Sequence, residues 1–174
     1  MLNKAYINLS TLKQNALNVK SKLPFSTRFC AVVKADAYGH GAPVIASALY
    51  NIVDAYTVAL VEEGEELRLC GIDKDILVTC PVYPFDLERL IRFDLTATVS
   101  SIEQVGLLNN EAKRQGKKVK IHVKYNTGMN RQGVDGIENL KKVLDKIKAS
   151  KNVVLDGMYS HFACPENNEE RKRA

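Results

Sequence analysis

The sequence predicts an α/β protein of the (β/α)8-barrel type, with about six β/α steps present. Segments of strand character alternate with segments of helical periodicity along the chain, which is typical of a parallel sheet with helical crossovers. No Gly-x-Gly-x-x-Gly motif follows a strand, which disfavours an open dinucleotide-binding sheet. Distinctive polar residues, Lys34, Lys124 and His161, stand at the ends of three different strands. A barrel collects such residues at the carboxyl face of its strands.

Seven segments have strand character. The first, 5–8, is short. Residues 29–33 form a continuous apolar run, which is typical of a strand buried on both faces and would place Cys30 in the core. The other expected strands are 55–60, 76–79, 96–99, 119–124 and 153–160.

Helical periodicity fills the intervals between these strands. Ser10 is expected to cap the first helix, and Pro24 stops it. Pro43 suits the first turn of the next helix. Two further helices are expected at 62–70, with acidic residues in its first turn, and near 85–92.

Two later helices carry capping-box spacing at their amino ends. Ser100 and Glu103 have this spacing before a helix that reaches about Gln115, and Asp135 and Glu138 have it before the next apolar stripe. Both pairs therefore predict where a helix begins.

Composition is ordinary for a soluble globular protein. The chain has 174 residues, 45% hydrophobic and 26% charged, with a net charge of +5. No apolar stretch is long enough for a transmembrane helix, and the amino terminus lacks a signal-peptide core, so we expect a cytoplasmic protein. No basic patch with interleaved aromatics indicates a nucleic-acid partner. The scattered cysteines suggest reduced thiols and no metal site; they are Cys30, Cys70, Cys80 and Cys164.

Lys34 is the most informative position because it ends a buried apolar run. A partly desolvated lysine at the carboxyl end of a strand is a good amine nucleophile, of the kind that forms a Schiff base with an aldehyde cofactor. The alternative from the residues alone is a solvated lysine at a strand end, since most lysines are surface residues.

Three motifs identify the resemblance. Residues 34–41, Lys-Ala-Asp-Ala-Tyr-Gly-His-Gly, resemble the pyridoxal-phosphate signature of the alanine racemase family. Residues 121–133 resemble its second motif, and residues 157–163 its third. The resemblance extends from Ala5 to about Asn168. It implies pyridoxal 5'-phosphate as cofactor, a small-molecule amino-acid substrate, and interconversion of L-alanine and D-alanine for peptidoglycan. It also implies a homodimer that shares its active sites. The composition and charge pattern lead us to expect neither nucleic acid nor membrane as partner.

The resemblance assigns roles to four residues. Lys34 would hold the cofactor and act as the base on one face of the substrate. The Tyr38 hydroxyl would contact the cofactor phosphate, Arg131 would hydrogen-bond the phenolate oxygen, and His161 would lie near the ring.

Three further residues of the second and third motifs bear on this site. Lys124 aligns with a lysine that is carbamylated in many family members, where the added carboxylate orients the arginine. Tyr159 precedes His161 by two residues, on the same face of the strand, and would support the site. The family usually has aspartate where this chain has Asn126.

A complete barrel needs eight strands and about 250 residues. We therefore expect 1–174 to be the amino-terminal part of a longer enzyme, ending within or just after strand six and without the family's carboxy-terminal β-domain. The second base, a tyrosine of the other subunit in the family, would lie in the later part, so little or no activity is expected of the chain alone. The open alternatives are a serine or broad-specificity racemase of the same fold, a non-catalytic pyridoxal-phosphate-binding module, and an inert fragment.

Overall fold

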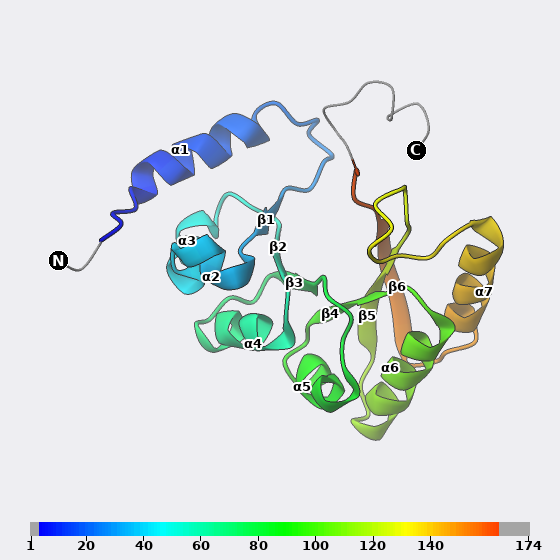
Figure 1. The fold of residues 1–174 in the computed structure, drawn as a ribbon. Coiled ribbons are helices and arrows are strands. Elements are labelled where there is room, and N and C mark those ends of the chain that lie inside the picture. Colours follow the sequence, from blue (N-terminus) through cyan, green and yellow to red (C-terminus); the bar gives the residue numbers. More distant parts are fainter. Residues whose placement is uncertain (1–3, 164–174) are drawn as a thin grey trace. The chain divides into compact units, whose positions relative to one another are not determined.

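The computed structural model describes residues 4–163, which divide between two compact units, one that ends at Thr79 and one that begins at Cys80. Figure 1 shows the alternation of helices and strands along the chain. The elements of the first unit are α1 (Leu9–Lys20), β1 (Cys30–Val32), α2 (Lys34–Gly39), α3 (Ala42–Leu49), β2 (Ala55–Val58), α4 (Val61–Leu69) and β3 (Asp75–Val78). Those of the second are η1 (Pro84–Asp86), α5 (Leu87–Arg92), β4 (Thr96–Val99), α6 (Ile102–Arg114), β5 (Val119–Lys124), α7 (Ile137–Lys148) and β6 (Val153–Tyr159).

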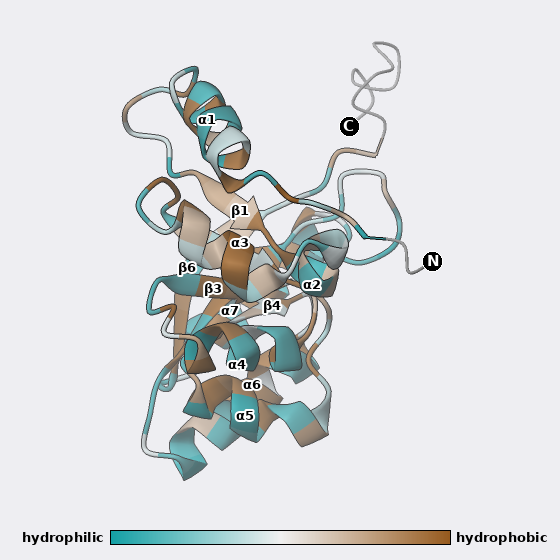
Figure 2. Cartoon of the chain, turned by 90° about the vertical axis from the view of Figure 1, so that its left-hand side faces the viewer, coloured by the Kyte–Doolittle hydropathy of each residue, from teal (hydrophilic) through white to brown (hydrophobic). Residues whose placement is uncertain are grey.

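The first unit is built on three parallel strands. β1 pairs with β2, and β2 pairs with β3, with Ala55 opposite both Cys30 and Asp75. Helix α4 carries both hydrophobic and hydrophilic residues, whereas α3 is mostly hydrophobic, as their colouring shows (Figure 2). Their apolar sides and the strands form the core, whose most buried members include Val33, Ala46, Tyr56, Val58, Leu67 and Ile76.

The second unit repeats this plan. β4 pairs in parallel with β5, and β5 with β6, where the register shifts between Ile121 and His122. The shift leaves Asp156 as an extra residue in β6, since Ile121 lies opposite Leu155 and His122 opposite Gly157. Helices α5, α6 and α7 supply the rest of the core, which includes Leu90, Ala97, Val99, Val105, Ile121 and Val123.

Six of the seven expected strands are confirmed to within about two residues. The expected strand at 5–8 is wrong, because this segment forms no strand pairing in the described part of the chain. Its last residue, Asn8, is instead the N-cap of α1, and its side-chain oxygen accepts the Thr11 N–H at 3.0 Å. Ser10, which the sequence suggested as the cap, already lies inside the helix.

Cys30 is exposed, so its expected place in the core is wrong. β1 buries one face only: Ala31 is buried, whereas Cys30 and Val32, the latter 54% exposed, lie on the other face. The Sγ atom of Cys30 lies 3.0 Å from the Thr57 hydroxyl on β2. Cys30, Cys70 and Cys80 are free thiols, and Cys164 lies outside the described residues.

The capping predictions for the two later helices are displaced. Ser101 caps α6, one residue after the expected Ser100, and its Oγ accepts the Gln104 N–H at 3.3 Å. At α7 the N-cap is Gly136 without a side-chain cap, because the Asp135 carboxylate is engaged by another partner described below.

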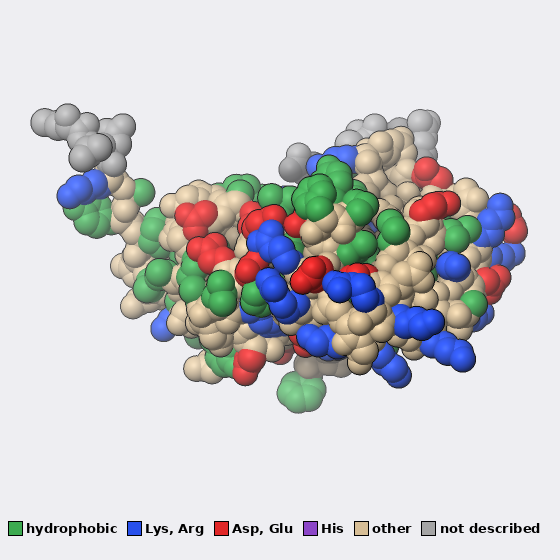
Figure 3. Space-filling model, turned by 90° about the horizontal axis from the view of Figure 1, so that it is seen from below, with side chains coloured by type: hydrophobic (Ala, Val, Ile, Leu, Met, Phe, Trp, Pro, Cys, Tyr) green, Lys and Arg blue, Asp and Glu red, His purple; other side chains and the backbone are tan. Residues whose placement is uncertain are grey.

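Acidic and basic side chains intermingle on the face that Figure 3 shows, with hydrophobic side chains between them. This pattern fits a modest net charge of +5 rather than one strongly basic surface on that face. Within residues 4–163, no helix combines the length and the apolar character that crossing a membrane requires.

Candidate active site

Lys34 follows β1 and stands at the carboxyl end of that strand. The Val33 N–H donates to the Thr57 carbonyl of β2 at 2.9 Å, so sheet pairing extends to the residue before the lysine. Val33 is 1% exposed, whereas Lys34 is half-buried. The lysine therefore leaves the core at the edge where the strand ends, as the sequence predicted.

The backbone after Lys34 is left-handed. Four consecutive residues without the freedom of glycine, Ala35 to Tyr38, have φ between 52° and 56°. A left-handed conformation costs roughly 1–2 kcal/mol per L-residue, or about 4–8 kcal/mol for the four. Such strain persists only where surrounding contacts fix it, and it gathers at functional sites. We call residues 34–38 the Lys34 turn.

Hydrogen bonds to the residues on either side of the turn hold this backbone in place. The Ala37 N–H donates to the Val33 carbonyl at 2.9 Å, and the Gly41 N–H to the Asp36 carbonyl at 3.0 Å. The Asp36 carboxylate accepts the Ala42 N–H at 2.6 Å, at the first residue of α3. The turn is therefore tied to the start of the following helix.

Tyr38 ends the Lys34 turn and lies beside the lysine. The Lys34 Nζ atom lies 5.9 Å from the centroid of the Tyr38 ring, within the range of a cation–π contact. The tyrosine is 68% exposed. The structure thus brings together Lys34 and Tyr38, two of the predicted site residues, in the first unit.

Lys124 is a buried lysine of the second unit. It is the last residue of β5 and is only 6% exposed. Its Nζ atom lies 5.7 Å from the centroid of the Tyr159 ring on β6. Lysines are rarely fully buried unless they are paired, so the burial of Lys124 sets it apart from the exposed lysines of the chain.

Tyr159 connects several groups of the second unit. Its hydroxyl lies 3.0 Å from the Thr98 hydroxyl on β4. Burial raises the pKa of Tyr159 above its ordinary value of 10, while the Thr98 hydrogen bond and the positive charge of Arg131 act in the opposite direction. Tyr159 therefore lies near Lys124 and within the electrostatic influence of Arg131, two residues that the sequence also assigned to the site. The sequence did not indicate Thr98, whose only signal was its place in a strand next to β5.

Arg131 is exposed on the loop after β5, and that loop folds back on the strand end. The Val134 N–H donates to the Lys124 carbonyl at 2.8 Å, and the Asn126 N–H to the Val134 carbonyl at 3.0 Å. Gly133 makes this return possible: its φ is +140°, and a Cβ there would lie 2.7 Å from the Asn126 nitrogen. The loop therefore has a fixed base near Lys124.

His161 is exposed and lies two residues beyond the end of β6. Its carbonyl accepts the Thr127 hydroxyl at 3.1 Å, which joins it to the Arg131 loop through the backbone. A different histidine, His122 on β5, is half-buried and lies 3.1 Å from the Asp156 carboxylate of β6. The predicted site residues thus fall into two groups, one in each compact unit.

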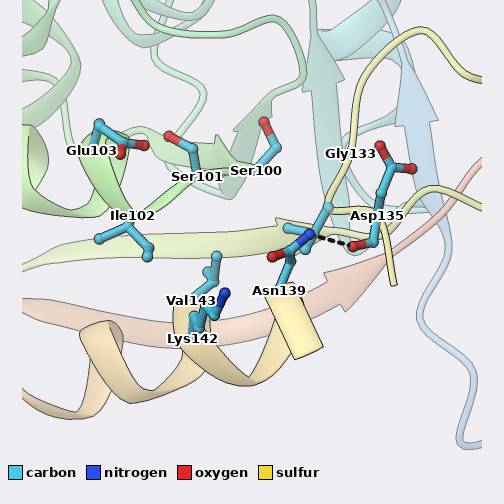
Figure 4. Close-up of a pocket in the computed structure, with 10 residues that line it drawn as sticks. Ser100, Ser101, Ile102, Glu103, Gly133, Asp135, Asn139, Lys142 and Val143 are labelled. Carbon is cyan, nitrogen blue, oxygen red and sulfur yellow. Dashed lines mark hydrogen bonds between the residues drawn. The ribbon is translucent and has the colours of Figure 1, made fainter. Parts of the chain in front are cut away.

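A pocket of about 290 Å³ lies in the second unit, between the start of α6 and the start of α7 (Figure 4). Its charged lining is mixed, with Glu103, Asp135 and Lys142. The Asn139 amide donates to the Asp135 carbonyl at 3.0 Å across one side of it. None of the site residues that the sequence indicated lines this pocket, so it is separate from the candidate site.

Comparison with known proteins gives consistent matches. The sequence profile described as "Alanine racemase, N-terminal domain" matches residues 7–174. An alanine racemase of Streptococcus pyogenes is 34% identical over 168 residues, which are 97% of this chain and 45% of that protein. The solved structure of alanine racemase from Clostridium difficile 630 has a TM-score of 0.91 at 36% identity, and the match covers 96% of this chain and 44% of that one.

A histidine racemase from Leuconostoc mesenteroides subsp. sake matches with a TM-score of 0.86 at 23% identity, over 94% of this chain and 45% of that one, which shows likeness of fold alone. The matches confirm the α/β fold class, and the chain spans about 45% of the length of the Streptococcus pyogenes relative. Because the profile takes in the Lys34 turn as well as Lys124 and Arg131, the chain belongs to the alanine racemase N-terminal domain family.

Proposed function

We propose that this chain is the amino-terminal part of a pyridoxal-phosphate-dependent amino-acid racemase that interconverts L-alanine and D-alanine. The observation that carries the proposal is Lys34, half-buried at the carboxyl end of β1 and followed by four strained left-handed residues. The complete enzyme would be a cytoplasmic homodimer that supplies D-alanine for peptidoglycan. Residues 1–174 would form the first part of its barrel.

The residues of the first unit suit an aldehyde cofactor that carries a phosphate. Lys34 offers a primary amine, and the exposed Tyr38 offers a hydroxyl within the same turn. Pyridoxal phosphate supplies, when bound, a conjugated ring that takes up the electrons left when the substrate loses its α-proton. Lys34 would hold that cofactor covalently, and Tyr38 would contact its phosphate.

In the second unit, Arg131 would supply a positive charge and Lys124 would orient that arginine. Arg131 would hydrogen-bond the phenolate oxygen, because a guanidinium is always charged and has several donors in one plane. A carbamylated Lys124 would present a carboxylate to that arginine, a charge-assisted pairing. His161 would lie near the ring, and Tyr159 would support Lys124 from the neighbouring strand.

Lys34 would also move a proton. Once released by the incoming substrate, its amine would take the α-proton from one face of the substrate. For the opposite enantiomer it would deliver a proton to that same face. Inversion requires a second acid or base on the opposite face, which the family takes from a tyrosine of the other subunit in the later part of its chain. We therefore expect residues 1–174 alone to racemise alanine slowly, if at all.

The decisive experiment is to trap the cofactor on Lys34. The chain is incubated with pyridoxal phosphate, reduced with borohydride, digested and analysed by mass spectrometry. We expect added mass on the peptide that contains Lys34, and no such mass in K34A. K118A, which removes an exposed lysine immediately before β5, should leave the labelling unchanged. A folded sample without label at Lys34 would contradict the proposal.

Carbamylation of Lys124 has its own test. ¹³C-labelled bicarbonate should give a carbamate carbon signal in the wild-type chain and in K118A, but not in K124A. An equal signal in K124A would show that another amine carries the group.

A further inference from the structure

Glu63 lies outside every group assigned above, yet it contacts the Lys34 turn. It is half-buried in the first turn of α4. Its Oε1 atom accepts the Ala35 N–H at 2.6 Å. Its Oε2 atom accepts the N–H groups of Ala59 at 2.6 Å and Leu60 at 3.0 Å. One carboxylate therefore joins the residue after Lys34 to the end of β2 and the start of α4.

The contact with Ala35 fixes the direction in which Lys34 leaves the strand. The Ala35 nitrogen belongs to the same planar peptide unit as the Lys34 carbonyl. Holding that N–H therefore holds the peptide plane on the carboxyl side of Lys34. Ala35 is also the first of the four left-handed residues, with φ of 52°. A strained turn that starts at a fixed plane has fewer ways to relax.

The second oxygen makes the carboxylate a rigid support. Ala59 and Leu60 connect β2 to α4, and their N–H groups hold Oε2 while Oε1 faces Ala35. Hydrogen bonds to an ionised carboxylate are roughly twice as strong as neutral ones. The start of a helix also favours negative charge.

We propose that Glu63 is a positioning residue that holds the Lys34 turn so that the lysine amine faces the cofactor aldehyde. This inference rests on the proposed function of Lys34. A carboxylate is required because three N–H donors approach its two oxygens. Glutamine has one acceptor oxygen and would turn its NH₂ group toward donors. Aspartate keeps both oxygens but is one methylene shorter.

The first test measures the Ala35 amide without cofactor. Hydrogen exchange is followed by NMR in wild type, E63Q, E63D and E66Q. E66Q is the matched control, because Glu66 is an exposed glutamate of the same helix. We expect Ala35 to exchange about tenfold faster in E63Q and E63D, the effect of losing about 1.4 kcal/mol of local protection. The core amide of Tyr56 should stay protected, which shows that each variant is folded. Unchanged exchange of Ala35 in both Glu63 variants would overturn the proposal.

The second test measures cofactor capture. Pyridoxal phosphate is titrated into each protein, and the adduct on the Lys34 peptide is quantified after borohydride reduction. We expect the apparent Kd to rise about tenfold in E63Q and E63D, and to stay at the wild-type value in E66Q. If the wild type is labelled and the Glu63 variants have the same Kd as the wild type, the role of Glu63 is refuted but the function of Lys34 is not. Absence of label in wild type would refute the function of Lys34, and this inference with it.

Discussion

The side-chain amide of Asn126 donates to the carboxylate of Asp135 across 2.5 Å. The same amide group donates to the Asn130 side chain at 2.8 Å, and its oxygen accepts the N–H groups of Gly128 at 3.2 Å and Asn130 at 3.0 Å. Asn126 thus organises the loop that carries Arg131. An aspartate at 126 could accept the two N–H bonds but could not donate to Asp135. The acid at 135 and the amide at 126 therefore form a matched pair.

N126D tests this pairing. The substitution places two carboxylates together and removes a donor, so we expect a loss of about 1–3 kcal/mol in the free energy of unfolding at neutral pH. Urea denaturation measures it. The double variant N126D/D135N restores one donor and one acceptor, and it should recover most of the loss. If the double variant is less stable than N126D, the two side chains are not a pair.

G133A should destabilise the same loop through a steric clash. The added Cβ would lie 2.7 Å from the Asn126 nitrogen, and the φ of +140° is unfavourable for alanine. G116A is the control, because Gly116 also has positive φ, +65°, but open space around its Cβ position. We expect G116A to cost about 1 kcal/mol and G133A at least about 2 kcal/mol more, both measured by urea denaturation. Equal losses would show that the loop yields to the clash.

Most strands could be located from the sequence because each is a short apolar run between segments of helical periodicity. The segment 5–8 shows the limit of that reasoning: its residues suit a strand, but strand formation needs a neighbour, and local sequence does not show one. Asp135 shows the same limit at a helix start. Its spacing with Glu138 is that of a capping box, yet its carboxylate is held by Asn126, which tertiary folding brings beside it.

The sequence motifs proposed residues for the candidate site, but they gave no indication of the backbone conformation that follows Lys34. Motif resemblance indicated Lys34 and Tyr38, and the structure places them beside each other. No sequence pattern announces four left-handed residues at Ala35–Tyr38, since alanine favours right-handed helix. Glu63 was visible only as an acidic residue in a helix's first turn. Its contact with Ala35 spans 28 positions in the chain.

T98V tests the contact between β4 and the candidate site. The Thr98 hydroxyl lowers the pKa of Tyr159, so its removal should raise that pKa further above 10. Ultraviolet titration of the tyrosines measures this, with Y159F used to identify the Tyr159 contribution. T96V is the matched control, since Thr96 is a buried threonine two residues away on the same strand. A Tyr159 pKa that stays the same in T98V would contradict the hydrogen bond.

Tyr56 should make the first unit sensitive to high pH. Its side chain is fully buried, its hydroxyl donates to the Ala46 carbonyl at 2.6 Å, and burial raises its pKa from 10 to about 12. The unfolded chain ionises this tyrosine near pH 10, whereas the folded chain keeps it neutral. Its stabilising effect is therefore complete below pH 10 and is lost as pH rises toward 12, by about 2–3 kcal/mol in all.

Comparison of wild type with Y56F isolates this effect. At pH 9 the wild type should be more stable by about 1 kcal/mol, because phenylalanine lacks the hydrogen bond to Ala46. Between pH 10 and 12 the difference should shrink and change sign, since Y56F has no hydroxyl to ionise on unfolding. Urea denaturation at pH 9 and between pH 10 and 12 measures both the stability difference and its change of sign. Y6F, which alters a tyrosine that is 89% exposed, controls for the loss of one hydroxyl and should follow the wild-type curve. Parallel curves for wild type and Y56F would mean that Tyr56 titrates alike in the folded and unfolded chain, and that its burial does not protect the neutral phenol.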